Sequence, residues 1–381
     1  MEKQPIKIMQ IIARMNVGGP AILVSSLVRE LNSDGFETRL ISGYCEENEL
    51  DFLETVATDI RCIKIKGLGR KVSIFSDFKS LVLLIKQIRD FQPDIIHTHT
   101  IKAGVLGRVA SIISLQKSFR VHTFHGHLLI GYFRKSIVLA IILIEKALAL
   151  KTDVLLAVGT KVRDDLVSAG IAPKGKFQIT YPGLQRFKSL QSFEIRKELD
   201  IQDQIMVVFV GRLTKIKRPD RFIQAAITLN DLHSKVVFVV VGDGELLESL
   251  RDLAANSSAE FRFTGWRNDV EDIIQASDIV ALTSDNEGIP LTLIQACQSG
   301  KPIVATKAGS VSDVVIDGKN GYLAELSVKE FAESLRKLIK DNDSRVKFGS
   351  EGIKIAAEKF SMESMINQHK TIYSQQIHTP N

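Results

Sequence analysis

Short apolar runs alternate with longer segments of helical period along this chain, and the alternation starts again halfway. Runs such as Val207–Val210 are apolar at every position, which is typical of parallel strands covered on both faces. The alternation predicts βαβ units and therefore an α/β fold with parallel sheets. Helices are expected between most strands, as at Ala21–Leu31, Phe78–Phe91 and Lys161–Ala169. The expected strands are Ile6–Ala13, Glu37–Ile41, Arg61–Ile65, Asp94–His97, Arg120–Phe124, Asp153–Val158, Phe177–Thr180, Ile205–Val210, Lys235–Val241, Phe261–Thr264, Asp278–Leu282 and Pro302–Ala305.

The restart predicts two doubly wound Rossmann-like domains in one chain. A turn-rich segment at 181–185, followed by a polar stretch, marks the boundary between them. We expect an N-terminal domain at 1–183, a second domain at 184–359, and a C-terminal helix at 360–381 that returns to the first domain. Two such sheets normally face each other across a cleft, and ligands bind beyond the carboxyl ends of the strands.

The composition is that of an ordinary globular protein with a mild positive charge. There are 50 Lys and Arg against 44 Asp and Glu, so the net charge of +6 suits an anionic ligand or an anionic membrane surface. One Trp and five Tyr without basic interleaving argue against nucleic-acid binding. Three cysteines without metal-ligand spacing indicate a reducing compartment.

No segment has the pattern of an export signal or a membrane span. The most apolar stretch, Ile137–Leu150, is interrupted by Glu145 and Lys146 and is shorter than the roughly 20 residues that a span needs. We interpret it as a buried or interfacial helix and expect a cytoplasmic protein. Five basic residues without an acid lie within residues 61–71, namely Arg61, Lys64, Lys66, Arg70 and Lys71. With the apolar stretch, they favour peripheral contact with the inner face of the cell membrane.

Glycine-rich and basic loops follow the first strand of each half. Gly18 and Gly19 open the first helix, where glycine lets a phosphate approach the backbone and the helix N-terminus favours an anion. Arg212 and Lys217 follow the strand 205–210 and could bind phosphate as a planar donor and a point charge. Gly-Asp-Gly at 242–244 follows the next strand. The alternative interpretations are a tight turn and a solvated basic loop.

Five histidines cluster at the ends of expected strands: His97, His99, His122, His125 and His127. One of them could contact a ligand or take part in catalysis while most are structural. A metal site, suggested by His97 and His99, is a further alternative. No acidic residue lies between positions 97 and 127, which argues against metal.

The segment 284–296 contains the densest group of candidate residues. A helix is expected from near Pro290, a residue favoured in the first turn. Its N-terminal amides could hold an anion, with Glu287 at the mouth of the helix and Gln295 about 12 Å further along. This order matches the sugar, diphosphate and ribose of a nucleoside diphosphate sugar. The residues expected at the start of the helix are Gly288, Ile289, Pro290 and Leu291.

Seven segments in order give the chain a family resemblance: the Gly18-Gly19 loop, HTHTIKAGVLGR, HTFHGH, GRLTKIKRPD, VVGDGE, TGWRND and SDNEGIPLTLIQA. The chain resembles a retaining GT-B glycosyltransferase of family 4, a group that builds bacterial polysaccharides and glycolipids. The resemblance implies transfer from a nucleoside diphosphate sugar to a glycan or lipid-linked acceptor, without cofactor or metal. It implies that the leaving diphosphate is stabilised on the face where the acceptor attacks.

The resemblance also assigns roles to residues. His125 and Glu287 are implied to contact the donor sugar and are the candidate catalytic residues. Arg212 and Lys217 are implied to hold the diphosphate, while the backbone of Trp266 and Arg267 frames the base. The implied donor-binding residues are Gly18, Gly19, Arg212, Lys217, Trp266, Arg267, Gly288, Ile289, Pro290, Leu291 and Gln295.

Two glutamines depart from the family pattern. Gln295 stands at the position of the second acid, which grips the ribose, and Gln185 stands where many relatives carry an acid. An amide oxygen still accepts hydrogen bonds, but more weakly than a carboxylate. The departures keep open a low-activity sugar-nucleotide-binding subunit, and the histidine cluster keeps open a nucleotide-sugar epimerase on the same fold. Asp341 and Asp343 have the spacing of a metal motif, but we interpret them as a solvated helix junction.

Overall fold

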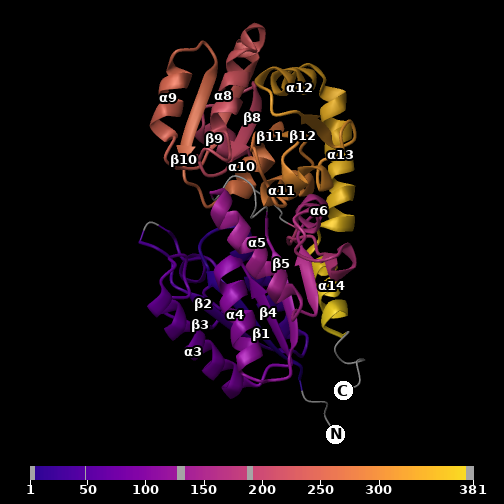
Figure 1. Ribbon diagram of the computed structural model, residues 1–381. Coiled ribbons are helices and arrows are strands. Elements are labelled where there is room, and N and C mark those ends of the chain that lie inside the picture. Colours follow the sequence, from indigo (N-terminus) through magenta and orange to yellow (C-terminus); the bar gives the residue numbers. More distant parts are fainter. Residues whose placement is uncertain (1–4, 48, 127–133, 187–191, 375–381) are drawn as a thin grey trace. The chain divides into compact units, whose positions relative to one another are not determined.

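The computed structural model describes residues 5–47, 49–126, 134–186 and 192–374, which form two compact units (Figure 1). The first unit consists of the described residues up to Gly183 together with those from Glu363 onward. The second unit is Leu184–Met362. The chain therefore leaves the first unit once, builds the second, and returns with its last helix.

The described part of the first unit contains a parallel sheet of seven strands in the order β3-β2-β1-β4-β5-β6-β7. Helices cover the sheet as in a doubly wound fold (Figure 1). Its strands are β1 (Lys7–Arg14), β2 (Glu37–Gly43), β3 (Cys62–Lys64), β4 (Ile95–His99), β5 (Phe119–Phe124), β6 (Val154–Ala157) and β7 (Phe177–Ile179). Its helices are α1 (Gly19–Ser33), α2 (Phe52–Thr55), α3 (Ile74–Phe91), α4 (Ile101–Ile113), α5 (Lys135–Ala149), α6 (Thr160–Ser168), the 3₁₀ turn η1 (Lys174–Lys176) and α14 (Met362–Ser374).

The second unit repeats the plan with six parallel strands, among the residues described, in the order β10-β9-β8-β11-β12-β13. Its strands are β8 (Ile205–Val210), β9 (Val236–Val241), β10 (Glu260–Gly265), β11 (Ile279–Leu282), β12 (Ile303–Thr306) and β13 (Gly321–Ala324). Its helices are α7 (Ser192–Glu198), α8 (Pro219–Ile227), α9 (Leu247–Ala255), α10 (Val270–Ala276), α11 (Leu291–Gln298), α12 (Val328–Lys340) and α13 (Asn342–Lys359), with 3₁₀ turns η2 (Asn230–Lys235) and η3 (Gly309–Asp313).

The predicted α/β class with two Rossmann-like sheets is confirmed, and three elements differ from expectation. β4 runs on to His99, past the predicted end at His97, because its polar side chains find buried hydrogen-bond partners. α3 begins at Ile74 rather than at Phe78. β13 was not predicted, since it has four residues and starts at Gly321. A Cβ at Gly321 would lie 2.2 Å from the carbonyl oxygen of Ile303, so close pairing with β12 requires glycine there.

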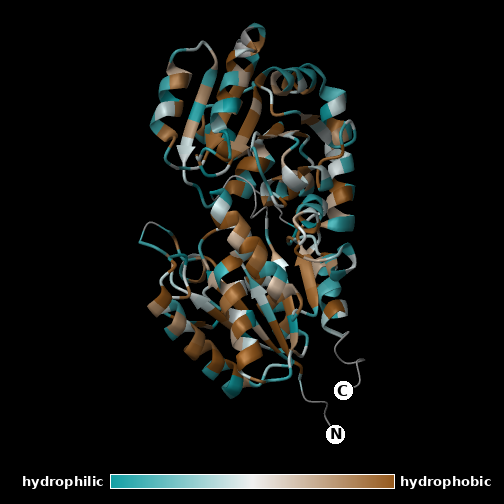
Figure 2. Cartoon of the chain, viewed as in Figure 1, coloured by the Kyte–Doolittle hydropathy of each residue, from teal (hydrophilic) through white to brown (hydrophobic). Residues whose placement is uncertain are grey.

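The stretch Ile137–Leu150 lies largely in α5 (Lys135–Ala149), and of the two interpretations, a buried or an interfacial helix, the first is wrong for most of its residues. Of its residues, only Glu145, Leu148 and Ala149 are buried, whereas side chains such as Leu143 are exposed. In Figure 2, the ribbon of α5 is largely brown, the colour of hydrophobic residues. None of the described helices combines the length and the apolarity that crossing a membrane requires.

Glu145, one of the two charged residues that interrupt this stretch, has a buried partner. Arg108 of α4 donates from Nη2 to both carboxylate oxygens of Glu145 at 2.7 Å, and each side chain is 1% exposed. Arg108 also donates from Nε to the carbonyl oxygen of Gly104 at 2.8 Å. Glu145 therefore links α5 to α4 through a buried ion pair.

Candidate functional site

The loops at the carboxyl ends of β8 and β9 are packed backbone against backbone. A Cβ at Gly242 would lie 2.0 Å from the carbonyl oxygen of Gly211, and one at Gly244 would lie 2.5 Å from that of Leu213. Both glycines have positive φ, 133° and 156°. The amide of Leu213 donates to the carbonyl oxygen of Asp243 at 2.9 Å. These glycines are thus required by packing, and they hold the loop that carries Arg212 and Lys217 in place.

Lys217 and Glu287, two residues predicted from separate motifs, meet in the structure. Lys217 Nζ lies 2.5 Å from Glu287 Oε1, although the residues are 70 positions apart. The hydroxyl of Ser284 donates to the same oxygen at 2.6 Å. The carbonyl oxygen of Glu287 accepts from the amide of Ser310 at 3.2 Å. The structure therefore combines a cation, a carboxylate and the start of α11 in one place.

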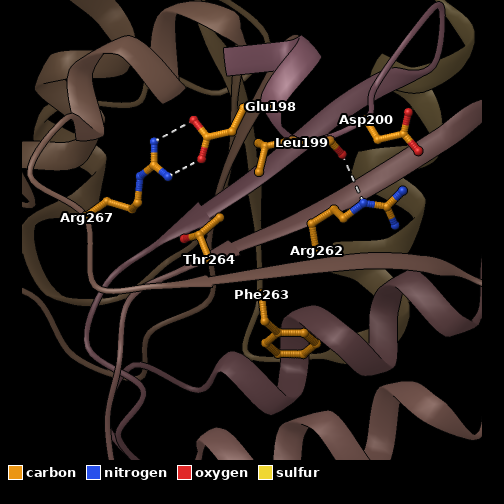
Figure 3. A pocket seen from close by; sticks show the side chains of 7 residues that line it. All are labelled: Glu198, Leu199, Asp200, Arg262, Phe263, Thr264 and Arg267. Carbon is orange, nitrogen blue, oxygen red and sulfur yellow. Dashed lines mark hydrogen bonds and ion pairs between the residues drawn. The ribbon is translucent and has the colours of Figure 1, made fainter. Parts of the chain in front are cut away.

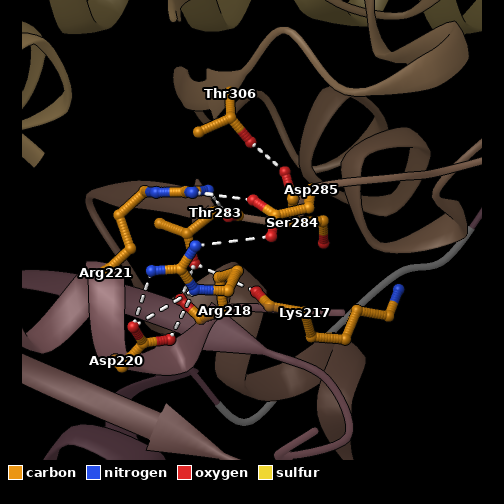
Figure 4. A network of polar contacts seen from close by, with 8 residues as sticks. All are labelled: Lys217, Arg218, Asp220, Arg221, Thr283, Ser284, Asp285 and Thr306. Atoms are coloured by element: carbon orange, nitrogen blue, oxygen red, sulfur yellow. Dashed lines mark hydrogen bonds and ion pairs between the residues drawn. The ribbon is translucent and has the colours of Figure 1, made fainter. Parts of the chain in front are cut away.

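A polar network beneath this pair joins the loop after β8 to the loop after β11 (Figure 4). The Thr283 hydroxyl donates to the carbonyl oxygen of Arg218 at 2.8 Å. The buried Arg221 donates to the carbonyl oxygen of Thr283 at 2.5 Å and to Asp285 Oδ1 at 2.7 Å. Arg218 contacts the other oxygen of Asp285 at 3.3 Å. These bonds fix both loops, so Lys217 and Glu287 are held at their separation by buried contacts.

Arg212 lies on the same loop but is not one of the residues of this network. Its side chain is exposed, and none of the residues described pairs with its guanidinium. The amides of Gly288, Ile289 and Leu291 likewise have no acceptor among the described groups, and Pro290 caps α11. Free donors at a helix N-terminus and a free guanidinium are suited to an anion such as a diphosphate.

Gln295, on the second turn of α11, has an acidic neighbour that the sequence did not reveal. Its Nε2 donates to Glu271 Oε1 of α10 at 3.0 Å, and both residues are half-buried. The amide nitrogen is therefore occupied, and the amide oxygen of Gln295 is the atom left to accept a hydrogen bond from a ligand.

Trp266 and Arg267 follow β10, and their side chains behave differently. Trp266 is exposed. Arg267 is bound by two carboxylates, Glu198 at 2.5 Å and Asp269 at 2.6 Å. Hydrogen bonding to Arg267 lowers the pKa of both acids. The Arg267 guanidinium is therefore fully engaged, and its backbone is the part left to contact a ligand.

Arg267 also forms one wall of a pocket of about 360 Å³ (Figure 3). Arg262 Nε donates to the carbonyl oxygen of Leu199 across this pocket at 3.0 Å. Glu198 and Arg267 are paired with each other, whereas Arg262 pairs with Glu260, which does not line the pocket. The lining residues are Glu198, Leu199, Asp200, Arg262, Phe263, Thr264 and Arg267. None of them except Arg267 was a predicted site residue.

In the first unit, the histidines form a connected chain of hydrogen bonds. His125 Nε2 lies 2.9 Å from His99 Nδ1, and His99 Nε2 lies 2.8 Å from the amide oxygen of Gln10. Gln10 donates to the Tyr373 hydroxyl at 3.3 Å, and that hydroxyl lies 2.7 Å from His97 Nδ1. His97 Nε2 reaches the Thr123 hydroxyl at 2.7 Å. Both nitrogens of His97 and His99 are thus occupied, which leaves neither ring a lone pair for a metal.

This chain sets the protonation of His125. With the amide oxygen of Gln10 facing His99, the proton of His99 lies on Nε2 and its Nδ1 accepts from His125. His125 then carries its proton on Nε2 and a lone pair on Nδ1. Burial lowers the pKa of His125 to about 3, so the ring is neutral at physiological pH. His122 bonds separately to the Thr98 hydroxyl at 2.8 Å, and His127 lies outside the described residues.

Gly18 and Gly19 open α1 as predicted. Gly18 is the N-cap with φ of 165°, an extended conformation open to any residue, and a Cβ there would lie 3.9 Å from the nearest described atom. Neither the backbone nor the packing of this unit therefore requires glycine at position 18. A ligand that approaches the backbone would require it.

The motif at Asp341 and Asp343 has a structural role. The Asp341 side chain caps α13 by accepting from the amide of Ser344 at 3.0 Å, which confirms the helix junction. Gln185 is exposed. Among the residues described, no group of three or more His, Cys, Asp or Glu side chains could hold a metal ion.

Sequence reasoning missed Glu271, Ser284, Gln10 and Tyr373. Ser284 lies two residues after the end of β11, at the start of the segment 284–296, and could have been found. The other three act through contacts between elements far apart in the chain, and no local pattern signals them.

Two doubly wound units in one chain are the architecture of GT-B glycosyltransferases. Residues 17–185 match the family described as "Glycosyltransferase Family 4", and residues 191–355 match "Glycosyl transferases group 1". A galactosyltransferase of Escherichia coli that transfers from UDP-Gal to GlcNAc-diphosphoundecaprenol is 30% identical over 82% of each chain. This chain belongs to the family 4 glycosyltransferases.

Other relatives agree with this assignment. The capsular polysaccharide biosynthesis glycosyltransferase CapM of Staphylococcus aureus is 24% identical over 81% of this chain and 83% of its own. The structure of Anabaena HepE in complex with UDP-glucose superposes with a TM-score of 0.83 at 21% identity, over 97% of this chain and all of that one. At that identity the likeness supports the fold.

Proposed function

We propose that this glycosyltransferase moves a sugar from a nucleoside diphosphate sugar to a glycan or lipid-linked acceptor, with retention of configuration, in the synthesis of cell-surface polysaccharide. The names of the E. coli and S. aureus relatives, which act on a diphosphoundecaprenol-linked sugar and in capsule formation, support this acceptor class. We propose that the enzyme is cytoplasmic and works at the inner face of the cell membrane.

The observation that carries the proposal is the Lys217–Glu287 pair at the start of α11. In the free enzyme each charge neutralises the other. A diphosphate at the free amides of Gly288, Ile289 and Leu291 competes for the Lys217 ammonium. Glu287 is then released to accept hydrogen bonds from the hydroxyls of the donor sugar. The same two side chains thus keep the empty site neutral and recognise the donor when it binds.

Transfer then depends on positioning and electrostatics. Arg212, Lys217 and the helix amides stabilise the negative charge that develops on the leaving diphosphate. The diphosphate oxygen takes the proton of the acceptor hydroxyl as the new bond forms on the same face, which retains the configuration. This route needs no divalent metal. The neutral ring of His125 accepts, through Nδ1, a hydrogen bond from the donor sugar and orients it.

The nucleoside is held further along the second unit. The amide oxygen of Gln295 accepts from the ribose, and the backbone of Trp266 and Arg267 frames the base. Because the Gln295 amide nitrogen donates to Glu271, the orientation of the amide group is fixed. Its oxygen therefore accepts from the ribose in one direction.

Replacing Arg212 by Ala tests the diphosphate site. Loss of a donor that acts on developing charge typically lowers kcat by about 10²–10³, and we expect a loss of that size. A thermal-shift screen with UDP-, GDP- and ADP-sugars first identifies the donor, since saturating ligand stabilises by about 2.7 kcal/mol at 100 times Kd. Turnover of Arg212→Ala is then compared with that of the wild type.

Arg251→Ala is the matched control, because Arg251 is an exposed arginine on α9 whose partner is Glu248. It should turn over like the wild type. Full activity in a folded Arg212→Ala protein would overturn the diphosphate assignment. Nuclear magnetic resonance of the product reports the anomeric configuration, and an inverted product would refute retention.

A further inference from the structure

Three large apolar side chains at the start of α3, and a fourth two residues before it, project into solvent. Val72, Ile74, Phe75 and Phe78 are 83%, 91%, 72% and 64% exposed. Phe75 and Phe78 lie three positions apart, so they share one side of the helix. The side that packs on the core instead holds Leu84 and other buried residues further along α3. Contiguous exposed apolar side chains mark interaction sites. We call these four residues the α3 tip.

The backbone of the α3 tip is held in place by polar contacts. Lys102 of α4 donates to the carbonyl oxygen of Lys71 and pairs with Asp77 at 2.6 Å. The amide of Ser73 donates to the Asp77 carboxylate at 3.3 Å. On the preceding loop, the carbonyl oxygen of Lys66 accepts from the Ser80 hydroxyl at 3.2 Å. The apolar side chains are therefore presented by fixed backbone on both sides of the helix start.

Uncompensated positive charge surrounds the α3 tip. Asp77 is the single acid in the sequence from 61 to 89, and Lys102 neutralises it. Lys79 Nζ lies 4.6 Å from the centroid of the Phe75 ring, which keeps the charge beside the aromatic group. The exposed basic residues on this loop and helix start are Lys66, Arg70, Lys71 and Lys79.

We infer that the α3 tip inserts into the interface of an anionic lipid bilayer, with the surrounding Lys and Arg side chains at the level of the headgroups. Projecting aromatic and aliphatic side chains with a basic border match a surface that is apolar inside and negatively charged outside. This inference rests on the proposed function, whose membrane contact it assigns to named residues. The binding itself needs neither donor nor acceptor.

Flotation of the full chain with vesicles tests the inference. One set of vesicles is phosphatidylcholine alone, and the other is an equal mixture of phosphatidylcholine and phosphatidylglycerol. We expect the wild type to float with the anionic vesicles and to be released by high salt. The variant Phe75→Ser/Phe78→Ser should lose at least tenfold in bound fraction, and Arg70→Glu/Lys71→Glu should lose a similar amount.

The matched control is Phe193→Ser/Val346→Ser, which removes two apolar side chains of the second unit that are 79% and 66% exposed. It should bind like the wild type. The inference is overturned if the wild type ignores anionic vesicles, if it binds neutral vesicles equally well, or if the control loses as much as the α3 variants. The nucleotide-sugar thermal shift is measured on every variant. If the wild type shows the thermal shift but does not float, only the membrane role of the α3 tip is refuted. If the wild type shows no thermal shift, the proposed donor site is refuted.

Discussion

The amide of Gln295 fits its surroundings better than a carboxylate would. Its Nε2 donates to Glu271 at 3.0 Å, so an acid at this position would face a second carboxylate at hydrogen-bond distance. Two carboxylates that close cannot both ionise without cost, and the pKa of one of them must rise. An amide at 295 therefore removes repulsion and leaves the carboxylate of Glu271 paired. The departure from the family pattern thus coincides with an acidic neighbour, Glu271, that an amide suits.

Gln295→Glu should therefore weaken nucleotide binding at neutral pH, although the family pattern has an acid there. We expect a loss of about 1–3 kcal/mol, the range for a polar group left without its hydrogen-bond partner. The swap Gln295→Glu/Glu271→Gln restores a donor–acceptor pair and should recover most of the affinity. Calorimetric titration of the wild type and both variants measures this. Tighter binding by the single variant would mean that Glu271 does not control the position.

At the scale of elements, the sequence predicts those features that depend on residues close together in the chain. It does not predict those that depend on contacts between distant segments. The meeting of Lys217 with Glu287 was predictable in outline, because each follows a strand and parallel strands end at one edge of their sheet. The early start of α3 was not, since its first turn is apolar yet makes no core contact. Nor was the partner of Glu145, because an acid in an apolar stretch looks the same whether it ends a helix or pairs with one.

Removing one partner of the Arg108–Glu145 pair should lower the free energy of unfolding strongly. Replacing both residues with apolar ones should lower it much less. Glu145→Ala leaves the Arg108 guanidinium buried and uncompensated, which typically costs about 3–5 kcal/mol of unfolding free energy. Arg108→Met/Glu145→Leu removes both charges and should recover most of that loss. Urea denaturation provides the comparison. Arg251→Met, in an exposed pair, should change stability by less than about 0.5 kcal/mol. A mild effect of Glu145→Ala would show that α5 is fastened by other contacts.

At the scale of the whole molecule, the two units differ in the histidines that their sequences contain. The first contains a group of histidines kept neutral by burial, which lowers the pKa of His369 to about 4 and that of His97, His99 and His122 well below the ordinary range. The sequence of the second unit contains one histidine, His233. The class of each unit followed from the alternation of strands and helices, but this asymmetry in chemistry comes from how the strand ends pack.

Acid should unfold the first unit before the second. Histidines of the unfolded chain take up protons near pH 6.5, while their folded counterparts do not, so stability falls as the pH drops below that value. At pH 5 each such histidine costs about 2 kcal/mol, and several together match the 5–15 kcal/mol stability of a typical domain. Urea denaturation from pH 7.5 to pH 5 measures the loss, and proteolytic fragments identify the unit that opens. Equal loss in both units would contradict the prediction.

The single Trp of the chain offers an internal reporter for that experiment. Trp266 lies in the second unit and its fluorescence follows that unit alone. Circular dichroism follows both. A fall in circular dichroism while the fluorescence is unchanged is the expected result at pH 5.

From His125 through His99 and Gln10 to Tyr373, each group donates a hydrogen bond to the next. The hydrogen bonds of this series therefore all have the same direction. Reversing the direction of one of these hydrogen bonds reverses the others. The change then reaches the Nδ1 atom of His125, which gains a proton in place of its lone pair. The opposite end is anchored on the last helix, more than two hundred residues away in the sequence. A polypeptide trimmed before α14 would keep both sheets and lose the anchor. Its His125 could then carry its proton on Nδ1, where the intact protein has a lone pair.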